Sequence, residues 1–258
     1  MNYISLSDVD QIYSLNSNIQ IKHQPVKHHN FGIFCLLLRK LECQLSETAK
    51  DDYWKNFLQL LRRYRFDLCA APLPFNHPTV YSPEKSTFLR KQLARCQFMY
   101  PDLLSSASDL VNCVESLSQL DSNPLLDFIE NDWQFEKVAL LLKESRLIPV
   151  VKKILATRPR LQRVELVVPS QLRSSTCYRN LVVIGPTRWF PEYVFSAPRA
   201  SAIQVVHYSW IRDKWTPKPV FVGSENVPEL EPKSASVIAE GATSTSKYIQ
   251  GKDLTESW

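Results

Sequence analysis

The first half of the chain carries apolar residues at the three- and four-residue spacing of amphipathic helices. Segment 51–67 (DDYWKNFLQLLRRYRFD) shows the spacing clearly. Ser82 and Pro83 are typical of an N-cap and a first helical residue, and they predict a helix that runs to about Met99. Further helices are predicted over 31–45, where apolar residues lie on most faces, over 101–117, which has a single apolar stripe, and over 124–131, where Asn123 and Pro124 mark a helix start. Residues 1–30 are polar and mixed, and we assign them to the same mainly helical region.

The pattern changes after residue 137, where short continuous apolar runs replace the helical stripes. Runs of this kind are typical of strands that are buried on both faces. They lie at 138–142, 164–168, 181–184 and 203–206, and helical segments are predicted between them at 146–157, 170–176 and 191–196. We therefore expect an α/β protein, with a helical N-terminal region packed on a small, mostly parallel sheet of the Rossmann/RecA-like type.

These patterns divide the chain into three regions. We predict a mainly helical region at 1–131, a basic α/β domain at 132–222 and a disordered tail at 223–258. The tail is rich in Glu, Pro, Ser and Thr and has no apolar stripe, a composition that cannot bury enough surface to fold. Residues 220–222 are a candidate edge strand.

Composition favours a soluble, cytoplasmic protein. The longest strongly apolar run, 31–38, is about eight residues long, whereas a membrane-spanning helix needs roughly 20. The N-terminal residues do not show the basic and apolar stretches of a signal peptide. We therefore expect no contact with a membrane.

The charge is distributed unevenly along the chain. The formal net charge is +5, yet residues 137–219 hold 15 Lys and Arg against 4 Asp and Glu, a local net charge of +11. A block this basic is typical of a surface that faces nucleic acid. It is equally compatible with a solvated face or with a patch that docks an acidic protein subunit.

Glycine is scarce, and its absence excludes two classes of enzyme. The sequence has no glycine between Gly32 and Gly185. A phosphate-binding P-loop and a dinucleotide-binding turn both need several glycines close together. The chain is therefore neither a self-sufficient P-loop ATPase nor a common Rossmann enzyme, and we expect no cofactor.

The sequence also predicts no metal site and no catalytic centre. His23, His28 and His29 are close together, but their spacing from the cysteines matches no zinc motif. His207 ends an apolar strand, where a histidine usually satisfies a local hydrogen bond. The acidic residues of the basic block are isolated from one another. An enzymatic role is therefore the weaker expectation.

Arginine and tryptophan gather beside the predicted strands. Arg188 and Trp189 follow the turn that ends one strand, Arg199 comes just before the next strand, and Arg212 follows that strand. We predict that Arg188 and Arg199 share one edge of the sheet, and that these four residues bind phosphate or nucleic acid there. In the alternative interpretation the aromatic rings cover the end of the sheet and the arginines cap backbone carbonyls.

The order of elements from 137 to 210 resembles the second RecA-like lobe of helicases. The strands KVALLL, RVELVVPS, NLVVIGPTRWF and IQVVHYSWI carry this likeness. The segment GPTRWFPEYVFSAPRA in particular resembles helicase-like proteins of bacterial anti-phage defence islands, of the DISARM-associated type. The resemblance covers about 75 of the 258 residues. It implies that Arg188 and Arg199 act on a nucleotide or nucleic acid, and that a partner must supply the missing first lobe.

Together these observations predict a nucleic-acid-binding accessory subunit without its own catalytic centre. The resemblance implies a setting in an anti-phage defence complex, with a protein partner and with DNA favoured over RNA. The alternative is a structural or adaptor protein that docks a partner subunit through its basic α/β domain.

Overall fold

The computed structural model describes residues 19–45, 52–131, 138–174, 176–213 and 236–239. The chain forms two compact units: a helical unit of residues 27–132, and an α/β unit that combines residues 1–26 with residues 133–258. The helical unit is thus inserted into the sequence of the α/β unit. No helix within the described ranges is both long enough and apolar enough to cross a membrane.

The helical unit has helices at the positions that the apolar spacing predicts. They are α2 (His29–Leu45), α3 (Asp52–Ala70), α4 (Pro83–Met99), the 3-10 turn η1 (Pro101–Leu103), α5 (Leu104–Leu117) and α6 (Pro124–Asn131). Ser82 caps α4 as predicted, because its hydroxyl accepts a hydrogen bond from the Lys85 amide at 3.5 Å. Aromatic side chains form much of the buried core: Phe31, Phe34, Trp54, Phe57, Tyr64 and Phe75.

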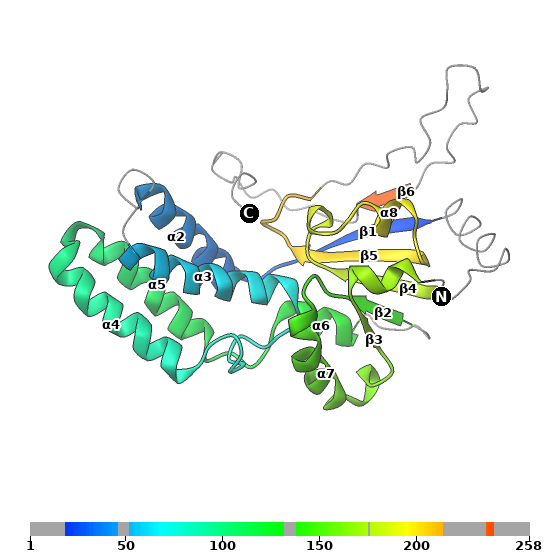
Figure 1. Cartoon of the computed structure of the whole chain (residues 1–258), viewed down its shortest axis with the longest axis horizontal. Coiled ribbons are helices and arrows are strands. Elements are labelled where there is room, and N and C mark those ends of the chain that lie inside the picture. Colours follow the sequence, from blue (N-terminus) through cyan, green and yellow to red (C-terminus); the bar gives the residue numbers. More distant parts are fainter. Residues whose placement is uncertain (1–18, 46–51, 132–137, 175, 214–235, 240–258) are drawn as a thin grey trace, which may run out of the picture. The chain divides into compact units, whose positions relative to one another are not determined.

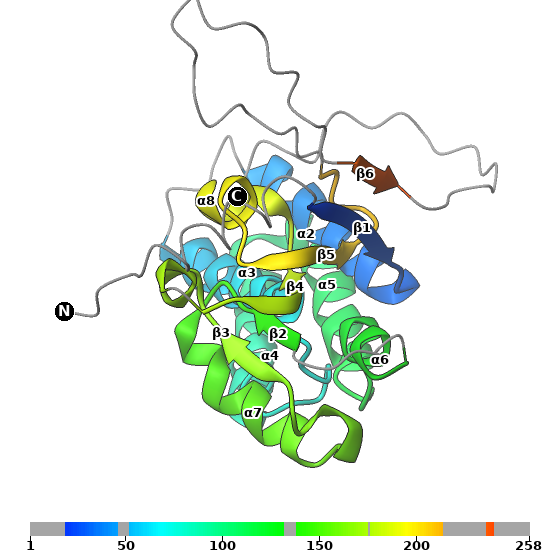
Figure 2. The same ribbon diagram turned by 90° about the vertical axis from the view of Figure 1, so that its right-hand side faces the viewer.

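The α/β unit is built on a parallel sheet, as predicted (Figure 1). Its strands are β1 (Gln20–Val26), β2 (Val138–Leu141), β3 (Glu165–Val167), β4 (Tyr178–Ile184), β5 (Ala200–Tyr208) and β6 (Ser236–Ala239). They lie side by side in the order β3-β2-β4-β5-β1-β6, and every neighbouring pair is parallel (Figure 2). The remaining elements are η2 (Ser145–Leu147), α7 (Ile148–Ala156), η3 (Pro159–Leu161), η4 (Pro169–Arg173), η5 (Thr187–Trp189) and α8 (Tyr193–Ser196).

Two interior strands of the sheet, β2 and β4, show why continuous apolar runs predict buried strands. All four residues of β2 are buried, and so are the last four residues of β4. A strand in the middle of a parallel sheet is covered on both faces, so neither face tolerates polar side chains. These strands hold the core of the unit.

Two strands of the sheet were not predicted. β1 lies in the segment that we assigned to the helical region, so the predicted boundary at residue 131 misplaces residues 19–26. Its sequence, QIKHQPV, is mostly polar, but it pairs with β5 over its whole length. β6 falls within the predicted disordered tail and pairs with β1. The rest of that tail, and the candidate strand at 220–222, lie outside the described residues.

Candidate functional site

The carboxyl ends of the parallel strands form one edge of the sheet, which we call the carboxyl edge. Lys143 follows β2, the turn η5 follows β4, and the segment from His207 to Asp213 ends and follows β5. β2 lies between β3 and β4, so the chain leaves β2 and β4 in opposite directions. Ligands of open parallel sheets bind at such a switch point. In this protein the Lys143 ammonium connects the two sides of the switch point, because it follows β2 and donates to the Trp189 carbonyl in η5, which follows β4.

Gly185 makes the turn that brings η5 back over the end of β4. Its φ of +111° is unfavourable for any residue with a Cβ. A Cβ at this position would also lie 2.6 Å from the Trp189 ring. Trp189 is packed against the turn and is only 9% exposed. Its indole therefore covers the sheet end, which is the alternative that the sequence left open, and little of the ring is available to stack on a base.

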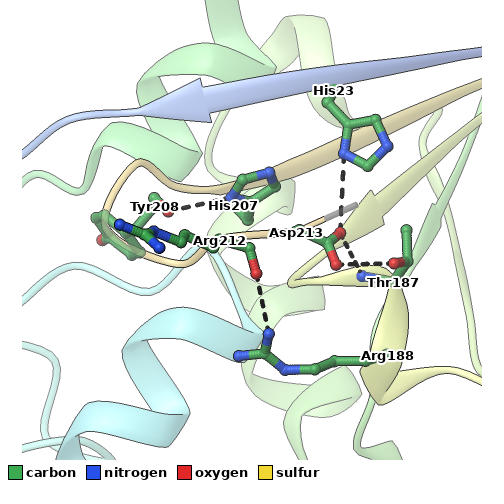
Figure 3. A network of polar contacts seen from close by, with 7 residues as sticks. All are labelled: His23, Thr187, Arg188, His207, Tyr208, Arg212 and Asp213. Carbon is green, nitrogen blue, oxygen red and sulfur yellow. Dashed lines mark hydrogen bonds and ion pairs between the residues drawn. The ribbon is translucent and has the colours of Figure 1, made fainter. Parts of the chain in front are cut away.

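Two of the predicted arginines do lie at the carboxyl edge. Arg188 and Arg212 are both exposed. The Arg188 guanidinium donates to the Arg212 carbonyl at 3.0 Å, which is the backbone-carbonyl contact of the alternative interpretation. This bond joins η5 to the segment after β5, and the Arg188 side chain is still exposed (Figure 3). That segment is itself held in place, because the Ser209 amide donates to the Val26 carbonyl at 2.8 Å and Ile211 is buried.

Arg199 lies at the opposite, amino edge of the sheet, so the prediction that it shares an edge with Arg188 is wrong. Its carbonyl accepts from the amide of Tyr178, the first residue of β4, at 2.7 Å. Neighbouring parallel strands start at one edge and end at the other, so the segment from Arg188 to Arg199 must travel the length of a strand. The Arg199 guanidinium donates to the carbonyls of Ser174 at 3.0 Å and Ala197 at 3.3 Å. A ligand-binding role for Arg199 stays a prediction.

Eight basic residues of the α/β unit lie near strand ends and are divided between the two edges of the sheet. Residues 138–213 contain 12 Lys and Arg against 4 Asp and Glu. Lys143, Arg188 and Arg212 belong to the carboxyl edge. Because α7 connects two parallel strands, it returns the chain to the amino edge. The cations that lie near or beyond its end, or at the start of β4 and β5, therefore belong to the amino edge: Arg158, Arg160, Arg163, Arg179 and Arg199.

A buried polar cluster also lies at the carboxyl edge, formed by His23, His207 and Asp213 (Figure 3). His23 is opposite Val205 in the β1–β5 pair, and His207 is opposite Pro25. Side chains alternate between the faces of a strand, so both histidines project from the same face. Their ring centroids are 6.0 Å apart at an angle of 73°. Asp213 comes from the segment after β5.

Thr187 holds the Asp213 carboxylate in position. Its amide donates to Asp213 Oδ2 at 2.6 Å, and its hydroxyl donates to Oδ1 at 2.8 Å. The amide belongs to the first residue of η5 and therefore has no partner within that turn. The Asp213 side chain is only 3% exposed, and Oδ2 lies 3.8 Å from His23 Nδ1.

The histidines differ in how their ring nitrogens are satisfied. His207 Nδ1 lies 3.0 Å from the Tyr208 carbonyl, which confirms the local hydrogen bond expected of this residue. Within the described part of the chain, neither ring nitrogen of His23 has a hydrogen-bond partner. Burial lowers the pKa of His23 below its usual value; nearby Asp213 opposes this shift and His207 adds to it. The His23 ring is therefore neutral at neutral pH.

Sequence reasoning missed this cluster because its members are far apart in the chain. His207 follows His23 by 184 positions, and Asp213 has no acidic neighbour that would mark it. The pairing of β1 with β5 brings the two histidines together, and the contacts of Thr187 place Asp213 beside them. The position of His207 at the end of a buried strand was the one local signal. No protein-family model matches this chain, and a search of curated proteins finds no significant match.

Proposed function

We propose that the α/β unit binds nucleic acid at the carboxyl edge of its sheet. The observation that carries this proposal is the pair of exposed arginines, Arg188 and Arg212, which lie together at that edge because the Arg188 guanidinium donates to the Arg212 backbone carbonyl. The planar guanidinium group donates in a geometry that matches phosphate oxygens. The nearby Asp213 carboxylate is buried and bound by Thr187, so it does not lie on the surface between the arginines and a ligand.

Trp210 adds an aromatic group to this surface. It is half-buried, lies between Tyr208 and Arg212 in the chain, and stacks on the Tyr208 ring with centroids 4.4 Å apart. Aromatic rings beside cations are typical of surfaces that bind single-stranded nucleic acid, because every base can stack. Trp210 is thus better placed than Trp189 for the stacking role that the sequence suggested.

Long-range electrostatics support the same proposal. The excess of Lys and Arg in residues 138–213 attracts a polyanion, and phosphate contacts gain free energy by releasing counterions. The resemblance to a second helicase lobe agrees with an accessory subunit that needs a protein partner for any ATP chemistry. By the same resemblance, the proposed setting is a bacterial anti-phage defence complex, with DNA as the preferred ligand.

The test is a salt titration of binding to labelled single-stranded DNA, duplex DNA and RNA. Affinity should fall steeply as salt rises. Arg188→Ala and Arg212→Ala should each weaken binding by about 1–3 kcal/mol and reduce the salt slope by roughly one unit. Lys152→Ala, at an exposed position of α7, makes the same change of charge away from the edge and should have little effect. Absence of binding at low salt, or an equal loss with Lys152→Ala, would refute the proposal.

The amino edge supports a second candidate function, docking of an acidic protein partner. Arg160, Arg163 and Arg179 are exposed there, and the carboxyl-edge arginines take no part. Under this alternative, a partner protein should stay bound after nuclease treatment. Its binding should be lost with Arg160→Glu and Arg163→Glu together, but kept with Arg188→Ala.

A further inference from the structure

The buried cluster of His23, His207 and Asp213 has no role in the proposed binding of nucleic acid. Each residue offers one ligand atom of a kind that binds metals, and these three atoms all lie within 4.8 Å of one another. They come from β1, β5 and the segment after β5, so the fold assembles them. We propose that His23, His207 and Asp213 bind one divalent transition-metal ion of the Zn²⁺ class.

The first argument is the state of His23. It is 9% exposed, and within the described residues neither of its ring nitrogens has a hydrogen-bond partner. Burial of a polar group without a partner is unfavourable, and such groups in native proteins usually indicate a bound water or ion. Asp213 Oδ2 lies 3.8 Å from His23 Nδ1, which is too long for a hydrogen bond. An ion between these two atoms would satisfy both.

The second argument is that the other two ligands are already held by further contacts. The Tyr208 carbonyl beside His207 Nδ1 places the ring proton on that nitrogen, which leaves the lone pair of Nε2 for a metal. Thr187 fixes the Asp213 carboxylate with its amide and its hydroxyl. Metal-binding histidines and carboxylates characteristically have outer contacts of this kind, which orient them toward the ion.

The ligand set determines the class of ion. Imidazole nitrogens suit Zn²⁺, Co²⁺, Fe²⁺ and Ni²⁺, whereas Mg²⁺ and Ca²⁺ prefer sites made of oxygen. Bonds of about 2.0–2.2 Å to Zn²⁺ require the distances between the three ligand atoms to shorten by about 1 Å when the ion binds. Three protein ligands leave a fourth position for water, whose pKa a zinc ion lowers toward neutrality.

The test uses the full chain, stripped of metal by a chelator and then titrated with Zn²⁺ or Co²⁺ in the absence of nucleic acid. We expect one ion per chain, a higher melting temperature, and a Co²⁺ spectrum of nitrogen and oxygen ligands. His23→Gln and Asp213→Asn should each weaken binding by at least about 100-fold. Thr187→Val should weaken it by about 10–100-fold. His29→Gln, at an exposed histidine of α2, should leave the affinity unchanged.

Three results would overturn this proposal: fewer than one ion bound by the wild-type chain, a sulfur-to-cobalt charge-transfer band that places the ion on cysteines, or an equal loss of affinity with His29→Gln. Circular dichroism without metal identifies a variant that fails to fold. If His23→Gln fails to fold, the stoichiometry and the Co²⁺ spectrum of the wild type decide the question alone. Because no nucleic acid is present, this result is independent of the proposed function.

Discussion

Thr187 joins η5 to the segment after β5, because its amide and its hydroxyl both donate to the Asp213 carboxylate. It can do so only because the chain turns sharply at Gly185, where a side chain would strain the backbone and collide with Trp189. Arg188 then reaches the Arg212 carbonyl from the next position. Consecutive residues of one short turn therefore position both the exposed arginines and the buried cluster.

A histidine in the helical unit makes stability depend on pH. His28 precedes α2, and its Nδ1 accepts a hydrogen bond from the Phe31 amide at 3.1 Å. Only the neutral ring can accept this bond. Burial lowers the pKa of His28 below its usual value; Asp127 opposes this shift and His29 adds to it. The unfolded chain therefore binds the proton more readily than the folded chain, so stability is complete above about pH 6.5 and falls as pH drops through the lowered pKa.

We predict that His28→Asn, which keeps an acceptor but does not titrate, loses less stability than the wild type between pH 7.5 and 5.5. His28→Ala should lose about 0.5–2 kcal/mol at pH 7.5, the usual effect of removing a helix cap. Urea unfolding at each pH measures both changes. The same decrease of stability with falling pH in His28→Asn and the wild type would contradict this account.

Local rules predicted some residue roles and not others. Ser82 and Pro83 are residue types that favour the start of a helix, and the structure confirms that Ser82 is the N-cap of α4. The hydrogen bond of His207 was likewise predictable from its neighbours. The roles of His23 and Asp213 depend on contacts across the sheet, so nothing in the adjacent sequence indicates them.

Strands are predictable when their burial is complete. β2 and the end of β4 lie inside the sheet, are fully buried, and appear in the sequence as continuous apolar runs. β1 has only two buried residues, each followed by a half-buried one, and it contains Pro25, a residue that weakens any strand prediction. Its place in the sheet comes from its pairing with β5, a partner distant in the sequence. A pattern within one segment cannot show this pairing, which is why the N-terminal strand was missed.

The role of β1 in the sheet predicts a large effect from a single N-terminal substitution. Ile21 is fully buried in β1 and pairs with Ile203. Ile21→Ala should lower the free energy of unfolding by about 2–5 kcal/mol, the usual cost of removing a core side chain. Gln20→Ala, at the exposed neighbouring position, should change it by less than about 0.5 kcal/mol. Equal effects of the two substitutions on urea unfolding would show that β1 is not a stable part of the sheet.

The whole molecule consists of two units, and the α/β unit is discontinuous in sequence. The sequence patterns predict the class of fold and the change from helices to strands. The predicted domain boundaries are less accurate, because they treat each region as one continuous stretch of the chain. The sequence also predicts that the basic residues form one continuous surface. Because a parallel sheet separates the starts of its strands from their ends, the fold divides the cations near the strand ends between two edges.

This discontinuity predicts how fragments should fold. Residues 27–132 alone should unfold cooperatively in urea, because they hold their own core. A fragment of residues 133–258 should be unstable, since it lacks β1. Joining residues 1–26 to residues 133–258 through a flexible linker of about 20 residues, roughly 25 Å in mean span, should restore cooperative unfolding. Equal stability of the two α/β fragments would contradict the division into these units.

The central claim is that the carboxyl edge of the sheet is the binding surface. The most direct measurement is an NMR titration of the isotope-labelled chain with an oligonucleotide, with the amide signals assigned. We predict that the signals of Thr187, Arg188 and Arg212 shift, while those of Arg163 and Arg179 at the amino edge do not. Shifts confined to the amino edge, or no shifts at low salt, would contradict the claim.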